Sequence, residues 1–65
     1  MKIVFNGADL DTDIPDLAAL VTDMGLDPSS LVIEHNFNVV KHDCWAHIPI
    51  QDGDVVELLN FVGGG

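Results

Sequence analysis

The chain has 65 residues, of which 11 are acidic and two are lysine, so its formal net charge at pH 7 is -9. This length provides for one small domain, and the negative charge disfavours binding to nucleic acids and to anionic membranes. Since 48% of the residues are apolar, the chain is too hydrophobic for a disordered acidic segment. An enzyme pocket is hard to build in so thin a core. A carrier or binding module with basic partners is therefore favoured.

The sequence contains no sign of export or membrane insertion. No apolar run approaches the roughly 20 residues of a membrane helix, and Asn6 and Gly7 interrupt the apolar N-terminus before it reaches the length of a signal peptide. The single cysteine, Cys44, cannot form a disulfide within the chain. We therefore expect a cytoplasmic domain over residues 1–60, followed by a flexible C-terminal tail over residues 61–65.

The N-terminal residues predict a β-hairpin. Residues 2–5 are rich in β-branched and aromatic side chains and end in Asn6-Gly7, a strong hairpin signal. Ile3 and Phe5 should share one face of the first strand. Uncharged residues, Ala8, Leu10 and Thr12, then alternate with aspartates through residues 8–13, which predicts a half-buried second strand with an acidic, solvated side.

A change of period after this hairpin predicts an amphipathic helix. Four apolar residues recur with the spacing of one helix face, namely Leu17, Leu20, Val21 and Met24. We expect Asp13 to cap the helix N-terminus, with Pro15 in the first turn and Asp16 placed to accept from the free amides. Gly25 is expected to end the helix.

The second half of the chain predicts strands at residues 31–36, 39–40 and 55–60, an irregular segment at residues 41–50, and a turn at Asp52-Gly53-Asp54. The element order indicates an α+β fold, a β-grasp with a mixed sheet of four to five strands covered on one face by one helix. The helix should pack on the inward-facing apolar residues of the sheet, Ile3, Phe5, Leu10, Ile33, Val56 and Leu58.

The three glycines Gly63, Gly64 and Gly65 close the sequence. Three consecutive glycines are costly to order, so a frayed end is one interpretation. The other is functional: a tail without Cβ atoms can enter a narrow channel of a partner and present the carboxylate of Gly65 there. That carboxylate becomes reactive only after a partner has activated it.

Four stretches of the sequence together resemble the ThiS/MoaD family of ubiquitin-like sulfur carriers, and within it the carriers of thiamin biosynthesis; these are residues 1–7, 17–25, 36–45 and 50–65. The resemblance covers the whole chain. Its most specific parts are the Asp52-Gly53-Asp54 turn, Trp45 and the Val62-Gly63-Gly64-Gly65 end.

The sequence departs from the family pattern at three places. Phe37 follows Asn36 where an Asn-Gly turn is common, Lys41-His42 replaces a common Pro-Arg pair, and His35 occupies a position expected to be aliphatic. These departures leave the type of turn at Asn36 open and put any contact made by the family arginine in doubt. The glycine tail is unaffected.

The resemblance implies that the chain is a co-substrate and not an enzyme. An E1-like adenylyltransferase of the ThiF type would adenylate the carboxyl of Gly65 with ATP and magnesium, and a persulfide donor would then displace AMP to leave a thiocarboxylate. A thiazole synthase of the ThiG type would receive the sulfur. No bound cofactor is implied. The alternatives are a small subunit of molybdopterin synthase, a ubiquitin-like modifier and a protein-binding β-grasp module.

Strand alternation also predicts a partner-binding patch. The side chains concerned should lie on, or beside, the sheet face away from the helix, next to the tail: Val4, Val55, Leu59, Phe61 and Val62. A cluster of exposed apolar residues often marks a docking surface. Alternatively, the segment of residues 41–50 covers this face.

We predict no metal site. The run Asp9-x-Asp11-x-Asp13 resembles the start of a calcium loop, but Ile14 and Leu20 occupy positions that require Gly and Glu.

A second group, His42, Cys44 and His47, matches no zinc spacing. We expect Cys44 to be a small filler near Trp45, Trp45 to anchor its segment on the sheet, and His35 to lie at the edge of the core with its polar atoms satisfied.

Overall fold

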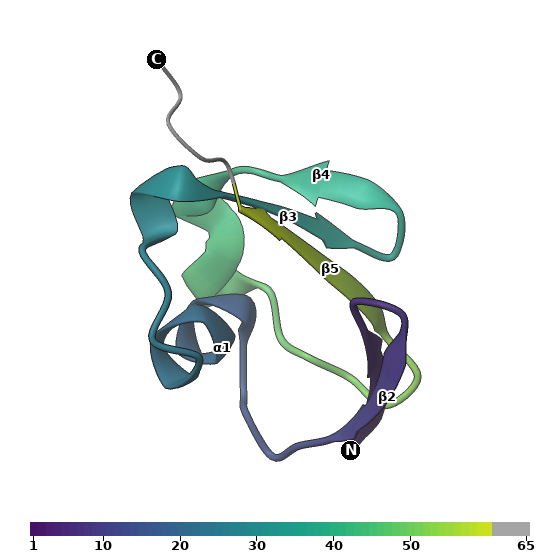
Figure 1. The fold of residues 1–65 in the computed structure, drawn as a ribbon. Coiled ribbons are helices and arrows are strands. Elements are labelled where there is room, and N and C mark those ends of the chain that lie inside the picture. The colour runs from purple at the N-terminus through teal and green to yellow at the C-terminus, as the bar shows by residue number, and fades with distance from the viewer. Residues whose placement is uncertain (61–65) are drawn as a thin grey trace.

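The computed structural model describes residues 1–60, which form five strands, one α-helix and two 3-10 helices. In chain order these elements are β1 (Lys2–Phe5), β2 (Ala8–Asp11), α1 (Leu17–Asp23), η1 (Pro28–Ser30), β3 (Leu31–His35), β4 (Asn38–Val40), η2 (His42–His47) and β5 (Val55–Asn60). The predicted mixed sheet with one helix is confirmed (Figure 1).

The sheet has the strand order β2-β1-β5-β3-β4. β5 is the last strand in sequence but lies in the middle of the sheet, parallel to β1 and antiparallel to β3 (Figure 1). The two outer pairs, β1–β2 and β3–β4, are antiparallel hairpins. β5 therefore joins two hairpins that have no other strand between them.

The core lies between the sheet and the helices. α1 and the green η2 segment lie on the same side of the sheet (Figure 1). The buried apolar residues come from both layers and are Ile3, Leu17, Leu20, Val21, Leu31, Ile33, Trp45, Ile50, Val56 and Leu58. Of the residues expected in the core, Phe5 and Leu10 are only partly buried, since they belong to the β1–β2 hairpin at the edge of the sheet.

The N-terminus of α1 differs from the sequence prediction. Asp16 and not Asp13 is the N-cap, because the backbone of Asp16 is extended and its carboxylate accepts from the Ala19 N–H at 2.8 Å. Pro15 lies before the helix, where its carbonyl accepts from the Ile50 N–H at 3.0 Å. The chain before α1 is thus held extended by a segment distant in sequence, which delays the helix start to Leu17.

The C-terminus of α1 lies close to its predicted position, but one core prediction fails there. Gly25 has a φ of 69° and the Leu26 N–H donates to the Val21 carbonyl, as in a Schellman motif. Met24 is the C-cap and is 38% exposed. It does not extend the buried stripe because the helix ends at Asp23.

The segment expected to be irregular contains η2. Trp45 is buried, and its indole N–H donates to the Val40 carbonyl at 3.1 Å, so it anchors this segment as predicted. Cys44 is exposed and does not fill the core. In the tight 3-10 geometry neighbouring side chains point in different directions, and burial of Trp45 leaves Cys44 in solvent.

Two turns with the same backbone hand connect the hairpin strands. Asn6 and Gly7 have φ values of 48° and 81°, and Asn36 and Phe37 have values of 50° and 71°. Positive φ at both central residues is the mark of a type I′ turn, in which the second position favours glycine. Phe37 therefore has a strained backbone conformation. Its side chain is 81% exposed, so burial of apolar surface does not offset this strain.

The two turns provide a reciprocal test of this strain. We expect Phe37→Gly to raise the free energy of unfolding by about 0.5–1 kcal/mol, after allowance for the larger unfolded-state entropy of glycine. Gly7→Ala should lower it by about 1 kcal/mol, since a Cβ at Gly7 meets no atom within 4 Å and only the backbone conformation is affected. Urea unfolding of both variants measures the changes; a loss of stability in Phe37→Gly would contradict the strain.

Candidate functional site

β5 is the element that leads into the C-terminal residues of the chain. It pairs with β3 along its length, from His35 opposite Val56 to Leu31 opposite Asn60. The sequence-predicted tail and its contact residues lie outside the described residues; these are Phe61, Val62, Gly63, Gly64 and Gly65. The described structure therefore fixes the strand from which they follow.

Two asparagine side chains hold β5 from either side. The Oδ1 atom of Asn6 accepts from the Leu58 N–H at 2.8 Å, and that of Asn36 accepts from the Val55 N–H at 2.8 Å. Both asparagines are the first residues of the left-handed turns. Glycine could adopt the same backbone but could not supply these acceptors, so each asparagine both forms its turn and bonds to β5.

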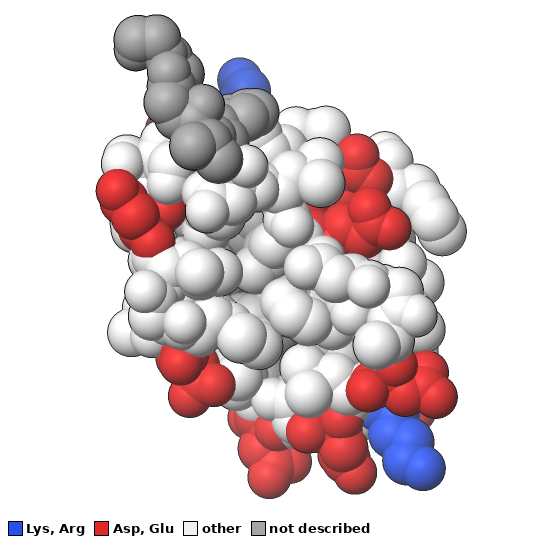
Figure 2. Space-filling view, viewed as in Figure 1, with Lys and Arg blue, Asp and Glu red and all other residues white. Residues whose placement is uncertain are grey.

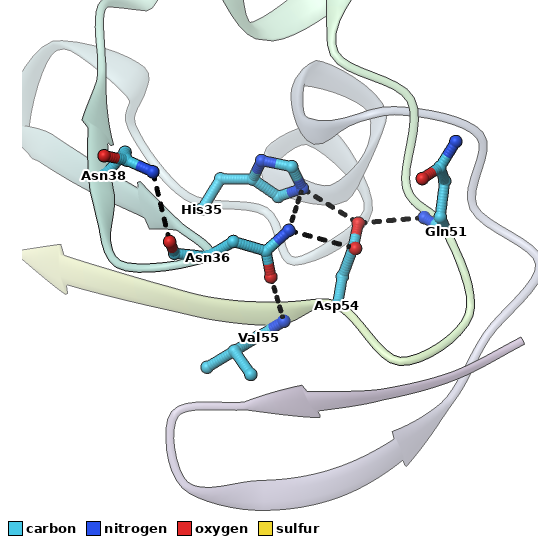
Figure 3. Close-up of polar contacts among 6 residues, drawn as sticks. All are labelled: His35, Asn36, Asn38, Gln51, Asp54 and Val55. Atoms are coloured by element: carbon cyan, nitrogen blue, oxygen red, sulfur yellow. Dashed lines mark hydrogen bonds and ion pairs between the residues drawn. The ribbon is translucent and has the colours of Figure 1, made fainter.

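A buried carboxylate fixes the start of β5. Asp54 is 7% exposed and precedes the strand directly. One carboxylate oxygen lies 2.8 Å from Nε2 of His35 and accepts from the Gln51 N–H at 2.9 Å, while the other accepts from Nδ2 of Asn36 at 3.2 Å (Figure 3). This network ties the end of β3 to the loop before β5. It also satisfies His35, as predicted for a histidine at the core edge.

The hydrogen bonds decide the ionisation of Asp54. Burial alone raises the pKa of its carboxyl, but the bonds from His35, the Gln51 N–H and Asn36 together outweigh burial, so the pKa lies below its ordinary value. Asp54 is therefore ionised in the folded protein at neutral pH. Because the folded pKa is depressed, its stabilising contribution is present above the unfolded pKa and is lost as pH falls through the folded pKa.

We predict that Asp54→Asn destabilises the protein at pH 7 by about 1–3 kcal/mol, because a buried acceptor is replaced by a group that can also donate. The difference from wild type should shrink as pH falls below about 4. Urea unfolding from pH 7 to pH 2.5 measures it. Asp23→Asn, an exposed change on α1, is the control, and equal pH dependence of wild type and Asp54→Asn would contradict the role of the carboxylate.

The sheet surface turned away from α1, here named the outer face, carries residues that alternate with the buried ones. Its members on β1, β5, β3 and β4 are Val4, Val55, Glu57, Leu59, Val32, Glu34 and Val39. Val4 lies opposite Val55, and Leu59, which is 49% exposed, lies opposite Val32. The outer face thus brings together the three predicted patch residues that the structure describes.

Sequence reasoning missed two apolar members of the outer face. Val32 lies between the buried residues Leu31 and Ile33 of β3, so the alternation along this strand could have placed it on the outer face. Val39, 68% exposed, lies opposite Glu34. Only the strand register shows that Val32 and Val39 adjoin the other patch residues.

The alternative that residues 41–50 cover the outer face is not what the structure shows. The Leu17 N–H donates to the Ile48 carbonyl, and Asp16 forms an isolated β-bridge with Pro49. Together with the burial of Trp45 in the core, these contacts place the segment on the α1 side. The described part of the outer face is free of it.

Acidic side chains gather at one end of the molecule. Figure 2 shows them along the lower end of this view, beside the N-terminus and β2, while residues of neither charge fill the middle. The N-terminal amine lies 3.6 Å from Asp11 and 3.9 Å from Asp13. This end of the fold is therefore the most acidic part of the view.

Residues 1–60 contain no group of three or more His, Cys, Asp and Glu side chains that could hold a metal ion. No pocket is found in this part of the chain. None of its helices combines the length and the apolar character needed to cross a membrane.

Comparison with known proteins gives the family. A model of the ThiS family matches residues 3–65, which is nearly the whole chain and includes the closing glycines. The chain belongs to the ThiS family. The predicted resemblance is thereby confirmed.

Solved structures agree with this family assignment. Over its full length the chain is similar to the crystal structure of the thiamine biosynthesis protein ThiS from Geobacter metallireducens, with a TM-score of 0.85, 26% identity and complete coverage of both chains. A solution structure of a thiamine biosynthesis protein from the same organism gives a TM-score of 0.80 at 26% identity and is covered to 88%.

Curated relatives connect this ThiS-family chain with larger proteins. It is 32% identical to a thiazole synthase of Paramagnetospirillum magneticum and 30% identical to one of Magnetococcus marinus, each over 66 aligned residues that include the whole chain. The chain spans 20% of the length of each relative. A segment like the present domain therefore occurs within proteins named for thiazole synthesis.

Proposed function

We propose that this ThiS-family chain is a sulfur carrier in thiamin biosynthesis, with the carboxyl of Gly65 as the site that carries sulfur. The single observation that supports this most is the family match over residues 3–65, which extends through the glycine end. The whole-chain likeness to the Geobacter ThiS structure supports the same role.

The chemistry follows from the low reactivity of a carboxylate. A partner adenylyltransferase binds ATP and magnesium, and a Gly65 oxygen attacks the α-phosphorus, so that pyrophosphate leaves and an acyl adenylate forms. The persulfide sulfur of a donor then attacks the acyl carbon and AMP leaves. A thiol cleaves the resulting S–S bond, and the thiocarboxylate remains on Gly65. The chain is thus a co-substrate, acting in the cytoplasm where ATP is available.

The proposed sulfur acceptor is a thiazole synthase. The two relatives in which a similar segment lies within a thiazole synthase support this partner, because one polypeptide there contains both parts. For the present chain, the thiazole synthase is either a separate protein or another part of a longer polypeptide.

Mass spectrometry tests the proposed carrier role. When the chain is incubated with ATP, magnesium, the adenylyltransferase and a persulfide donor, we expect the intact mass to rise by the difference between sulfur and oxygen, with the C-terminal peptide as the modified part. A chain lacking Gly65 should gain no sulfur. Its urea unfolding curve should match wild type, which separates loss of the reactive group from loss of the fold.

Other outcomes of this experiment would overturn the proposal. An isopeptide adduct on a target lysine would indicate a modifier, and an unmodified chain in the complete mixture would indicate a binding module. A chain purified from its own cell that continues past Gly65 would also contradict a carboxyl at that residue.

The patch of Val4, Val55, Leu59, Phe61 and Val62 is proposed as the surface that partners grip. We expect Leu59→Asp to lower the rate of adenylation at limiting enzyme by roughly tenfold, or about 1.4 kcal/mol, because a partner that covers the patch would have to bury an unpaired carboxylate. Phe61→Ala should act in the same direction.

Met24→Asp is the matched control, since Met24 is an exposed apolar residue on the helix side of the molecule. Rates of pyrophosphate exchange measure the effect, and circular dichroism verifies folding. Equal rates for Leu59→Asp and Met24→Asp would show that Leu59 does not contribute to binding of the adenylyltransferase.

A further inference from the structure

The turn between β1 and β2 places a side-chain amide directly before an unhindered backbone nitrogen. Asn6 and Gly7 are both exposed, and a Cβ placed at Gly7 would meet no atom within 4 Å. Within residues 1–60 no backbone hydrogen bond engages the Gly7 N–H. Because glycine also has no side chain of its own to obstruct an approach, the Gly7 nitrogen is free to react with the amide of Asn6.

The reaction open to this pair is deamidation, and asparagine is a thermolabile residue for this reason. A base removes the Gly7 amide proton and the nitrogen attacks Cγ of Asn6. The new N–Cγ bond closes a five-membered succinimide, the Cγ–Nδ2 bond breaks, and the amide nitrogen takes up a proton and leaves as ammonia. Water then opens the ring. Cleavage of the new N–Cγ bond gives aspartate, and cleavage of the original peptide bond gives isoaspartate.

Asn36 forms a turn of the same hand but is protected from this reaction. Phe37 follows it, and the phenylalanine side chain hinders the approach of its own backbone nitrogen to Cγ. The amide of Asn36 is also held at both ends, because Oδ1 accepts from the Val55 N–H at 2.8 Å and Nδ2 donates to Asp54 at 3.2 Å (Figure 3). Rotation of this side chain toward the next nitrogen breaks both bonds.

The Asn6 side chain is held less firmly. Its Oδ1 accepts from the Leu58 N–H at 2.8 Å, which is the one side-chain hydrogen bond of Asn6 found within residues 1–60. Attack by the Gly7 nitrogen requires Cγ to turn away from this bond alone. The two other asparagines, Asn38 and Asn60, precede valine and phenylalanine. Asn6 is therefore the only asparagine of the sequence that precedes a glycine.

The Asp52-Gly53 turn could cyclise in the same manner, with loss of water, but its atoms are engaged. Oδ1 of Asp52 accepts from the Lys2 N–H at 2.7 Å, and the Gly53 N–H donates to the Lys2 carbonyl at 2.8 Å. An ionised carboxylate is also a poorer electrophile than an amide. We therefore expect this turn to react more slowly than Asn6.

We propose that Asn6 is a site of spontaneous deamidation through attack by the Gly7 nitrogen, and that the isoaspartyl product loosens β5. The aspartyl product keeps an oxygen that can accept from the Leu58 N–H. Isoaspartate instead adds one carbon to the main chain of the two-residue turn and shortens the side chain by one carbon, so its carboxylate no longer reaches Leu58. This inference is independent of the proposed function.

Ageing of the folded chain in mildly alkaline buffer tests the site. Peptide mapping by mass spectrometry should show that the amide of Asn6 is lost roughly tenfold faster than that of Asn36, or more, because glycine leaves the attacking nitrogen unhindered. Isoaspartyl methyltransferase with a labelled methyl donor should label the same peptide, since isoaspartate forms through the succinimide.

Gly7→Ala is the matched variant. Its added Cβ hinders the attack, so loss of the Asn6 amide should slow by roughly tenfold, although the variant is expected to be less stable than wild type. Equal rates at Asn6 and Asn36, an unchanged rate at Asn6 in Gly7→Ala, or isoaspartate at Asp52 and not at residue 6 would overturn the proposed site.

The effect on β5 is tested with the aged chains after chromatographic separation. Asn6→Asp is the reference, because it has the charge of the isoaspartyl form and the main chain of the wild type. The isoaspartyl form should unfold at a lower urea concentration than Asn6→Asp, and its Leu58 N–H should exchange with solvent faster. Equal unfolding midpoints and equal exchange in the two forms would overturn the loosening of β5.

Discussion

The insertion of β5 between β1 and β3 is the constraint on which the remaining structure depends. Parallel register with β1 covers only two residue pairs, Val4 with Val55 and Phe5 with Val56. Beyond that point Asn6 continues the bonding through its side chain to Leu58. Short pairing with β1 is thus supplemented by side-chain acceptors, and both hairpins are joined through one strand.

Local patterns predicted most of the fold, and distant contacts account for the errors. The strand alternation and the helix spacing of Leu17, Leu20 and Val21 are local signals, and the structure confirms them. The local sequence favours Asp13 as the N-cap, because nothing near it in sequence shows that Pro15 accepts from the Ile50 N–H or that Leu17 donates to the Ile48 carbonyl. That pairing is set by tertiary structure.

In the candidate site, too, local patterns predicted some features, and distant contacts determine the others. Alternation placed Val4, Val55 and Leu59 on one face, but the opposition of Glu34 and Glu57 depends on the register between β3 and β5, which their separate patterns do not determine. The burial of Asp54 was equally hidden, because an Asp-Gly-Asp turn is ordinarily solvated. The contacts of residues 61–65 lie outside the described structure.

The central place of the last strand has a consequence for biosynthesis. A chain that stops before β5 leaves β1 and β3 with facing edges that nothing pairs, and such edges promote aggregation or degradation. Completion of the sheet therefore requires synthesis at least as far as Asn60. We therefore expect copies truncated before β5 to fail to form the sheet, because the strand that joins the two hairpins is then missing.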